Sequence, residues 1–226
     1  MSASSDDVSS HGKSTLSRLL VAKPRRIADE TSHHLSEQVL DGQGDKDEIS
    51  SIPTIRSKHT SLLFDAEKDA AVDHKSTEGS KFLVNIIDTP GHPNFSSEAI
   101  ASLRLTDGAL VTIDCVEGMC TQTETLLRHA LSERVKPILV ITKVDTLLNF
   151  HSDKETLYQC FSRTIDSFNA TISLYHDKAL GDAQVYPEKG MVTFASGLQG
   201  WAFTVRQFAF RYVQKFGVNR ASISPT

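Results

Sequence analysis

The spacing of apolar residues along the chain predicts alternating strands and helices. Short apolar runs predict strands at residues 57–64, 82–87, 109–113, 137–141 and 191–195. Apolar residues repeated every three or four positions predict helices at 13–22, 96–105, 121–132, 154–174 and 200–216. The continuous run at 82–87 is expected to be buried on both faces. Strands and helices that alternate in this way indicate an α/β fold with a mostly parallel, doubly wound sheet flanked by helices.

Three polar stretches lie outside this pattern. Residues 1–10 are rich in Ser and Asp and are expected to form a disordered N-terminal tail. Residues 25–53 predict a long functional or disordered loop, and residues 66–80 predict an exposed turn or insert. We expect one domain over residues 11–216, followed by a divergent C-terminal tail at 217–226. A chain of 226 residues that is 39% hydrophobic can bury the core of one such domain.

Composition and charge narrow the range of partners. The formal net charge of -4 argues against a general electrostatic grip on DNA or other nucleic acid, although a local basic face is compatible with it. The three cysteines show neither metal-ligand spacing nor a disulfide framework, which favours a reduced, intracellular chain. No secretory signal is visible, and no apolar run approaches the roughly 20 residues that span a bilayer. We expect a cytoplasmic monomer with no membrane association.

A phosphate-binding pattern opens the first predicted helix. Residues 7–14 have the length of the phosphate loop G-x-x-x-x-G-K-[ST]. Gly12 would let the backbone approach phosphate oxygens, and Lys13 would neutralise the β- and γ-phosphates. Ser14 would offer its hydroxyl to Mg²⁺, and the helix N-terminus would direct its amides at the anion. The pattern predicts a nucleotide that binds through its phosphates.

The first half of this loop departs from the pattern. Asp7 stands where Gly or Ala is expected, and its carboxylate would repel a phosphate. Residues 1–6 do not resemble the buried strand that normally precedes such a loop, so the first strand of the fold is missing or rewritten. The alternative interpretation is a Ser-rich tail ahead of an ordinary helix that starts with Gly-Lys-Ser.

The turn after the apolar run at 82–87 reads Asp-Thr-Pro-Gly-His. It would place the Asp88 carboxylate near Mg²⁺ and the Gly91 amide near a γ-phosphate. His92 would orient the attacking water. The alternative is a simple strand-end turn in which Asp88 bonds to its own backbone.

Two further motifs follow later strands and point to guanine. The Asp145 carboxylate in Thr142-Lys143-Val144-Asp145 can accept hydrogen bonds from both N1–H and the exocyclic amino group of guanine, a pair that adenine lacks. The stem of Lys143 would pack over the base, and Thr142 replaces the more usual Asn. After the strand at 191–195, the backbone amides of the turn at 196–198 (Ser196, Gly197 and Leu198) would lie near guanine O6. The alternative is that the first motif is a polar strand end without function and the second is an ordinary strand-to-helix turn.

A mobile threonine completes the predicted set. Thr54 follows the long polar segment at 25–53 and would contact Mg²⁺ and sense the γ-phosphate from a loop that orders on binding. The expected metal ligands are therefore Ser14, Thr54 and Asp88, the last acting through the ion's outer shell. The expected ligands are GTP or GDP with Mg²⁺.

Taken together, these motifs resemble those of the elongation factor 2 family of ribosomal translocases. The resemblance is dense between residues 57 and 216, and it is carried by residues 85–92, 95–98, 104–110, 114–118, 121–125, 136–137 and 197–204. The family's phosphate loop matches here at His11, Gly12, Lys13 and Ser14, followed by Thr15, and its first switch matches at Thr54. The resemblance implies a P-loop GTPase domain that hydrolyses GTP on the ribosome, with rRNA and ribosomal proteins as partners.

Several functions remain open from the sequence. The first is a GTP-hydrolysing domain that acts in translocation. The second is a degenerate or truncated GTPase-like binding module without hydrolysis, favoured by Asp7 and the missing strand. A paralogue of the translocase in ribosome maturation or splicing is a further alternative. An ATP-using P-loop protein is disfavoured by Asp145 and by the turn at 196–198.

Overall fold

The computed structural model describes residues 11–22, 56–65, 81–150, 153–175 and 180–216. The tails predicted at 1–10 and 217–226, the loop predicted at 25–53 and the insert predicted at 66–80 lie outside the described residues. So do Asp7 and Thr54. Within the described ranges no helix is long and apolar enough to cross a membrane.

A four-stranded sheet forms the centre of the molecule. It consists of β3 (Gly108–Asp114), β4 (Lys136–Thr142), β5 (Val192–Ser196) and β6 (Trp201–Thr204), in that order. The β3–β4 and β4–β5 pairs are parallel, and β5–β6 is an antiparallel pair in which Ser196 faces Trp201. Parallel strands need crossover connections, and helices supply them here. The predicted α/β class with a mostly parallel sheet is confirmed.

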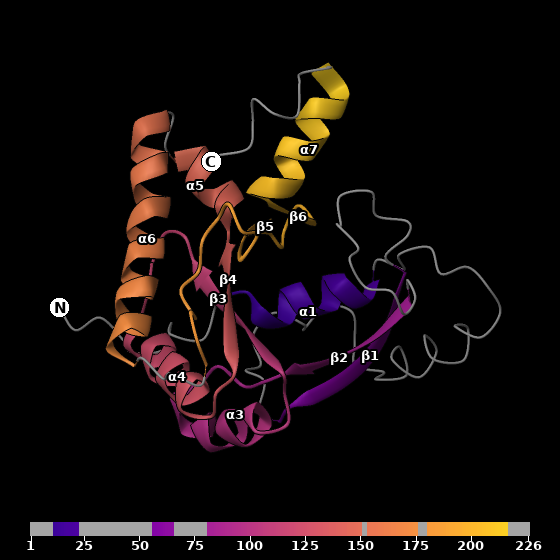
Figure 1. The fold of residues 1–226 in the computed structure, drawn as a ribbon, viewed down its shortest axis with the longest axis vertical. Helices are drawn as coiled ribbons and strands as arrows, with labels where there is room; N and C mark the ends of the chain where they lie inside the picture. The colour runs from indigo at the N-terminus through magenta and orange to yellow at the C-terminus, as the bar shows by residue number, and fades with distance from the viewer. Residues whose placement is uncertain (1–10, 23–55, 66–80, 151–152, 176–179, 217–226) are drawn as a thin grey trace.

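Helices cover this sheet and create the core (Figure 1). In Figure 1, α4 (Thr121–Ser132) and α6 (Lys154–Leu174) lie on the side of the sheet away from α1 (Lys13–Ala22). The core side chains between α4, α6 and the sheet include several with no exposed surface, among them Ile113, Leu127, Leu139, Ile141, Phe168 and Val192. The bounds predicted for these three helices are confirmed. Each has a clear apolar face, which sequence periodicity detects.

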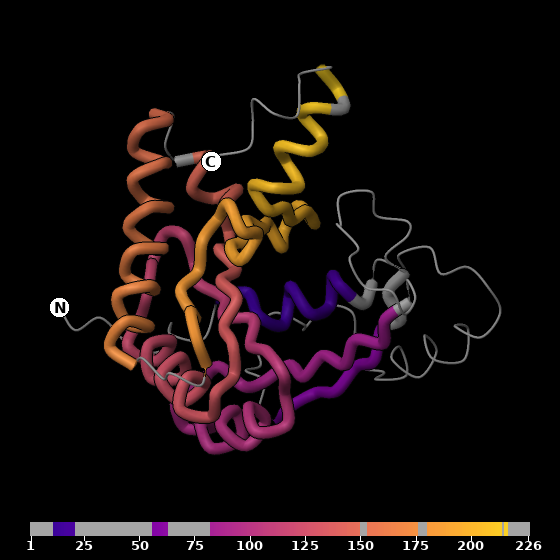
Figure 2. Tube along the Cα trace, in the orientation of Figure 1, coloured from indigo at the N-terminus to yellow at the C-terminus, as the bar shows by residue number. Residues whose placement is uncertain are grey.

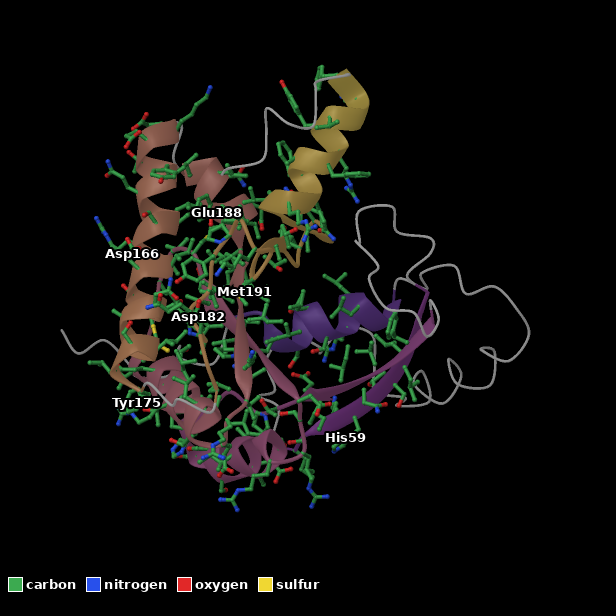
Figure 3. All side chains as sticks on the ribbon, in the orientation of Figure 1. His59, Asp166, Tyr175, Asp182, Glu188 and Met191 are labelled. Atoms are coloured by element: carbon green, nitrogen blue, oxygen red, sulfur yellow. The ribbon has the colours of Figure 1, made fainter. Side chains whose placement is uncertain are left out.

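The side-chain view shows one outward-facing and one inward-facing residue near α6 (Figure 3). Asp166 points from α6 into solvent, whereas Met191, just before β5, packs against the core. The helix begins at a well-formed N-cap. The Asp153 carboxylate accepts hydrogen bonds from the backbone N–H groups of Glu155 and Thr156, at 3.4 and 3.2 Å. These bonds satisfy amides that have no partner within the helix.

The strands β1 (Lys58–Asp65) and β2 (Lys81–Asp88) form a separate antiparallel pair (Figure 2). The strand β2 was expected to be buried, and this prediction is wrong. Phe82, Leu83 and Val84 are 41%, 66% and 42% exposed. The reason is that β2 pairs with β1 alone among the described residues, and β3 pairs with β4 alone. No described strand joins the two sheets where a central strand would bury both edges.

The remaining elements include two differences from the prediction. The helix expected at 200–216 is instead β6 followed by α7 (Val205–Phe216), because the aromatic residues at its start pair with β5. A short helix, α5 (Val144–Phe150), was not predicted. The helix α3 (Ser96–Leu103) follows the 3-10 turn η3 (Pro93–Phe95) and packs on α4, close to the predicted 96–105.

Candidate functional site

The predicted phosphate-binding residues start α1. Gly12 has a φ of 75°, a left-handed conformation that favours glycine, and its carbonyl accepts the Leu16 N–H at 2.9 Å. Lys13 is the first residue of the helix, and Ser14 and Thr15 follow in its first turn. The loop therefore turns sharply into a helix N-terminus, where unpaired amides favour an anion.

His11 anchors this turn to the sheet. Its side chain is 3% exposed, and its Nδ1 accepts the backbone N–H of Asp114 at 3.0 Å. Its Nε2 lies 3.4 Å from the Cys120 Sγ at the start of α4. Burial lowers the pKa of His11, and the positive charge of Lys13 lowers it further. The imidazole is therefore held neutral, with Nδ1 as the acceptor.

Thr142, at the end of β4, joins the phosphate turn to the base motif. Its hydroxyl lies 3.0 Å from the His11 carbonyl and 3.2 Å from the Ile113 carbonyl. A hydroxyl has one proton, so it donates to these two carbonyls alternately or shares the proton between them. The methyl and hydroxyl of Thr142 also lie 3.8 to 3.9 Å from the position a Cβ would take at Gly12. The strand end and the turn are thus in direct contact.

Lys143 and Asp145 follow on the same edge of the sheet. The Lys143 Nζ lies 2.6 Å from the Oδ2 of Asp114, which is the last residue of β3. Asp145 is 7% exposed in the first turn of α5. Asp114 is not among the site residues predicted from the sequence. Its position directly after an apolar run, like that of Asp88, was the available signal.

Lys13 lies in the electrostatic reach of Asp88, the last residue of β2. Burial lowers the pKa of Lys13, and the negative charge of Asp88 opposes this shift. The carboxylate and the ammonium therefore belong to one region, as the sequence predicts for a phosphate and Mg²⁺ site. A deprotonated lysine could not neutralise phosphate, so the effect of Asp88 favours the charged form that binding needs.

The Asp-Thr-Pro-Gly-His turn leads from β2 into η3. Gly91 is buried, and His92 is half-buried as the N-cap of η3. The Nδ1 of His92 accepts the Asn94 N–H at 3.2 Å, and its ring centroid lies 6.0 Å from that of Phe95. These contacts stay within the turn.

The turn after β5 meets α1. A Cβ placed at Gly197 would lie 2.9 Å from the Thr15 Cγ2, so only glycine fits this approach without a shift. Ser196 is 1% exposed, and its hydroxyl accepts the Gln199 N–H at 3.1 Å, whereas Leu198 is 89% exposed. The predicted turn therefore borders the phosphate side of the site, and Leu198 points away from the protein.

The donor set fits a nucleotide bound with Mg²⁺. The Ser14 hydroxyl and Asp88 carboxylate are hard oxygen donors, which Mg²⁺ prefers. Among the described residues, no three His, Cys, Asp or Glu side chains gather into a metal site of their own. Such a cation would therefore rely on phosphate oxygens for much of its coordination. This agrees with the expected pairing of metal and nucleotide.

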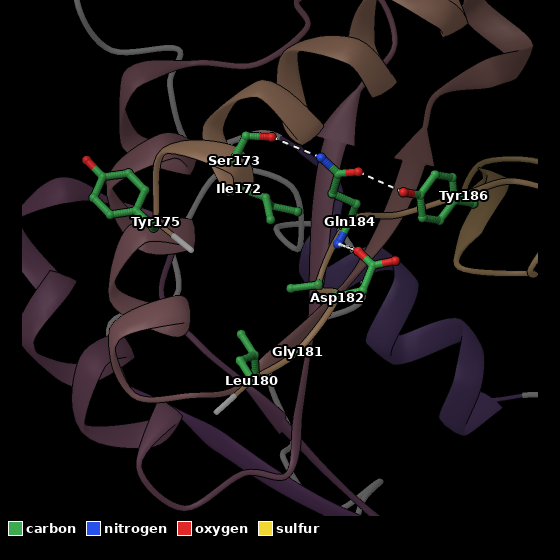
Figure 4. Close-up of a pocket in the computed structure, with 9 residues that line it drawn as sticks. Ile172, Ser173, Tyr175, Leu180, Gly181, Asp182, Gln184 and Tyr186 are labelled. Carbon is green, nitrogen blue, oxygen red and sulfur yellow. Dashed lines mark hydrogen bonds between the residues drawn. The ribbon is translucent and has the colours of Figure 1, made fainter. Parts of the chain in front are cut away.

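A hollow of about 520 Å³ lies elsewhere, between the end of α6 and residues 180–186 (Figure 4). Its polar groups bond to one another. The Gln184 side chain donates to the Ser173 hydroxyl at 2.9 Å and accepts from the Tyr186 hydroxyl at 2.7 Å. None of the sequence-predicted site residues lines it. The candidate site therefore lies at the ends of β3, β4 and β5, beside the start of α1.

Comparison with known proteins identifies the family and the fold. A family model described as the elongation factor Tu GTP binding domain matches residues 9–215. A crystal structure of the translation elongation factor SelB from Methanococcus maripaludis, in complex with the GTP analogue GppNHp, has a TM-score of 0.51 at 17% identity. The match covers 96% of this chain and 32% of that chain.

A second solved structure gives the same result. The bacterial selenocysteine-specific elongation factor EF-Sec matches with a TM-score of 0.50 at 20% identity, over 93% of this chain and 28% of that chain. At such identities the likeness shows the fold alone. The chain spans less than two thirds of the length of either protein. The expected P-loop type of α/β fold is confirmed.

Proposed function

We propose that this chain, which belongs to the family of elongation factor Tu GTP-binding domains, binds GTP and GDP with Mg²⁺ and hydrolyses GTP. The observation that carries the proposal is the bond from the Thr142 hydroxyl to the His11 carbonyl, at 3.0 Å. It joins a phosphate turn and a base motif that are 131 residues apart in the sequence. A nucleotide needs both at once, one for its phosphates and the other for its base.

Different residues would bind the phosphates, the base and Mg²⁺. Gly12 and the amides at the start of α1 would hold the phosphates, and the Lys13 ammonium would neutralise them. Asp145 would select guanine, and the amides at 196–198 would approach its O6. Ser14 and Asp88, together with Thr54, would hold Mg²⁺, which when bound neutralises charge on the phosphate oxygens.

Hydrolysis would depend on His92. The Nδ1 of this side chain is engaged with Asn94 in the turn, so Nε2 is the atom available to orient a water. The ring caps η3 and lies beside Phe95, with ring centroids 6.0 Å apart. We infer slow hydrolysis by the chain alone and faster hydrolysis when a partner reorients this turn. Positioning and charge stabilisation supply most catalysis in this reaction class.

The finer proposal is a domain of the elongation factor 2 type that acts in ribosomal translocation in the cytoplasm, as a monomer with rRNA and ribosomal proteins as partners. Its support is the sequence resemblance at residues 85–92, 114–118 and 197–204. The domain would occupy residues 11–216. The alternatives are a binding module without hydrolysis, and a paralogue in ribosome maturation or splicing. Among the described residues, β2 pairs only with β1 and β3 pairs only with β4, which favours the first of these.

The direct test is binding of fluorescent GDP and GTP to the purified chain with Mg²⁺, with ATP as competitor. We expect roughly micromolar or tighter binding that ATP does not displace. Lys13→Ala should abolish it. Lys189→Ala is the matched control, because this lysine pairs with Asp182 at an exposed position remote from the site. No binding by a folded chain would contradict the proposal.

Hydrolysis is tested next with and without ribosomes. We expect phosphate release to rise on addition of ribosomes and to be lost in His92→Ala, with GDP affinity nearly unchanged. GTP binding without hydrolysis under both conditions would favour the binding module instead.

A further inference from the structure

Asp114 is a buried carboxylate at the junction of the phosphate and base sides. Its side chain is 2% exposed, and its Oδ2 lies 2.6 Å from the Lys143 Nζ. Its Oδ1 accepts the Val116 N–H at 2.8 Å, and its own N–H donates to His11 at 3.0 Å. One residue thus contacts the base motif, the turn after β3 and the phosphate turn.

We propose that Asp114 is a positioning residue for guanine nucleotide binding, which acts by anchoring the ammonium group of Lys143. This inference rests on the proposed function. With its ammonium fixed at β3, the lysine can present its methylene stem to a base instead of extending into solvent. The Lys143 side chain is 36% exposed although its ammonium is paired, so part of this side chain is open to a ligand.

The backbone at Lys143 is held beside the same strand end as its side chain. Its φ is 56°, a left-handed conformation that costs a non-glycine residue energy. Its carbonyl accepts the Cys115 Sγ–H at 3.1 Å, so the backbone and side chain of Lys143 are both tied to the end of β3. A long side chain free to rotate would lose conformational entropy on binding a base. The ion pair removes part of that freedom before the ligand arrives.

Asp114 also connects the two halves of the site, through its backbone as well as its carboxylate. The Asp114 N–H holds His11, whose carbonyl faces the Thr142 hydroxyl, and Thr142 directly precedes Lys143. A closed set of contacts therefore joins β3, β4 and the turn before α1. The opposite possibility is that Asp114 competes with the ligand for Lys143. It predicts tighter nucleotide binding when the carboxylate is neutralised.

The test uses Asp114→Asn, which keeps the shape and an oxygen that can accept from Val116 but removes the charge. Asp182→Asn is the matched control, because Asp182 pairs with Lys189 at an exposed site, 3.7 Å apart. We expect Asp114→Asn to weaken binding of fluorescent GDP roughly ten- to a hundredfold, the scale of a charge-assisted hydrogen bond. The control should bind like the original chain.

A second variant separates positioning from folding. In a Lys143→Met background, which keeps the stem and removes the ammonium, Asp114→Asn should change GDP affinity less than about twofold. The double variant leaves no uncompensated buried charge, so it should fold at least as well as Lys143→Met alone. Equal losses in both backgrounds would show that Asp114 acts on the fold and not through Lys143.

A readout without nucleotide tests the anchor itself. The rate at which an N-hydroxysuccinimide ester acetylates Lys143, followed by mass spectrometry, should rise several-fold in Asp114→Asn and stay constant in the control. An unchanged rate overturns the anchor. A faster rate with unchanged or tighter GDP binding overturns the positioning role. If the original chain binds no guanine nucleotide, both the proposed function and the positioning role are wrong. If the original chain binds normally and Asp114→Asn does not change its affinity, only the positioning role is wrong.

Discussion

His11 shows how a single residue is set by its surroundings. Its ring is buried, its Nδ1 accepts the backbone N–H of Asp114, and the positive charge of Lys13 acts on it. All three favour the neutral ring, because a proton on Nδ1 would remove the acceptor and add a second positive charge. The folded-state pKa therefore lies below the 6.5 of a free histidine.

We expect this histidine to make stability depend on pH. Because its folded-state pKa is lowered, its contribution is fully present above about pH 6.5 and is lost as pH falls toward the folded-state value. The variant His11→Asn keeps an oxygen that can accept from Asp114 but cannot titrate. The free energy of unfolding, measured by urea between pH 7.5 and 5, should fall less steeply in His11→Asn. Parallel curves for the two proteins would contradict the assignment.

The cysteines should differ in reactivity. Burial raises the pKa of the Cys115 thiol to about 12, and this thiol donates to the Lys143 carbonyl. Cys120 and Cys160 are only partly buried. We expect iodoacetamide at pH 8 to label Cys120 and Cys160 in the folded protein, and Cys115 only after unfolding. Mass spectrometry of the peptides distinguishes them. Equal labelling of all three cysteines in the folded chain would show that burial does not protect Cys115 from the reagent.

At the scale of elements, α1 and the β5–β6 turn approach each other closely at Gly197. Gly197→Ala would place a methyl group 2.9 Å from the Thr15 Cγ2. We expect a loss of about 1–3 kcal/mol in the free energy of unfolding, as for other overpacked contacts. Adding Thr15→Ser removes the opposing methyl and should restore most of that loss. A loss that Thr15→Ser leaves unchanged would place the strain in the backbone.

Elements with one buried face could be predicted well from sequence. The helices α4 and α6 have the expected bounds because apolar residues recur at helical spacing and pack on a sheet. The strand β6 was missed because its aromatic residues, such as Trp201 and Phe203, suit a buried helix face equally well. The helix α5 was missed because it is short and begins inside the base motif.

The site could be predicted as a set of motifs but not as a network. Glycine, lysine and aspartate at strand ends have chemistry that is visible in short patterns. The bond from Asp114 to His11 spans 103 residues, and no local pattern encodes it. The exposure of β2 could not be predicted either, because burial depends on which strand lies beside it and not on its own apolar residues.

At the scale of the whole molecule, the two sheets should differ in local stability. The β1–β2 pair has exposed apolar side chains at Phe82, Leu83 and Val84, whereas Leu139 and Ile141 in β4 have no exposed surface. Local opening is easier where few apolar groups are buried. We expect hydrogen exchange of β1 and β2 amides to be much faster than that of β4 amides, measured by mass spectrometry on peptides. Equal protection would mean that the two sheets open as one unit.

The same experiment with GDP tests whether the ligand joins these parts. Asp88 ends β2 and acts on Lys13 of α1, so a bound nucleotide with Mg²⁺ would connect the smaller sheet to the larger one. We expect GDP to slow exchange near Asp88 more than within β4, whose amides are already protected. A uniform change would indicate global stabilisation only.

The place of Trp201 has an optical consequence. It is the one tryptophan of the chain, and it stacks on Phe203 with ring centroids 5.7 Å apart. Its indole N–H donates to the Gln199 side chain at 2.7 Å, and it lies opposite Ser196 across the β5–β6 pair. Emission from this half-buried ring therefore reports on the turn at 196–198. Ligand titrations can therefore be followed in the unlabelled protein, by the emission wavelength of this single tryptophan beside the site.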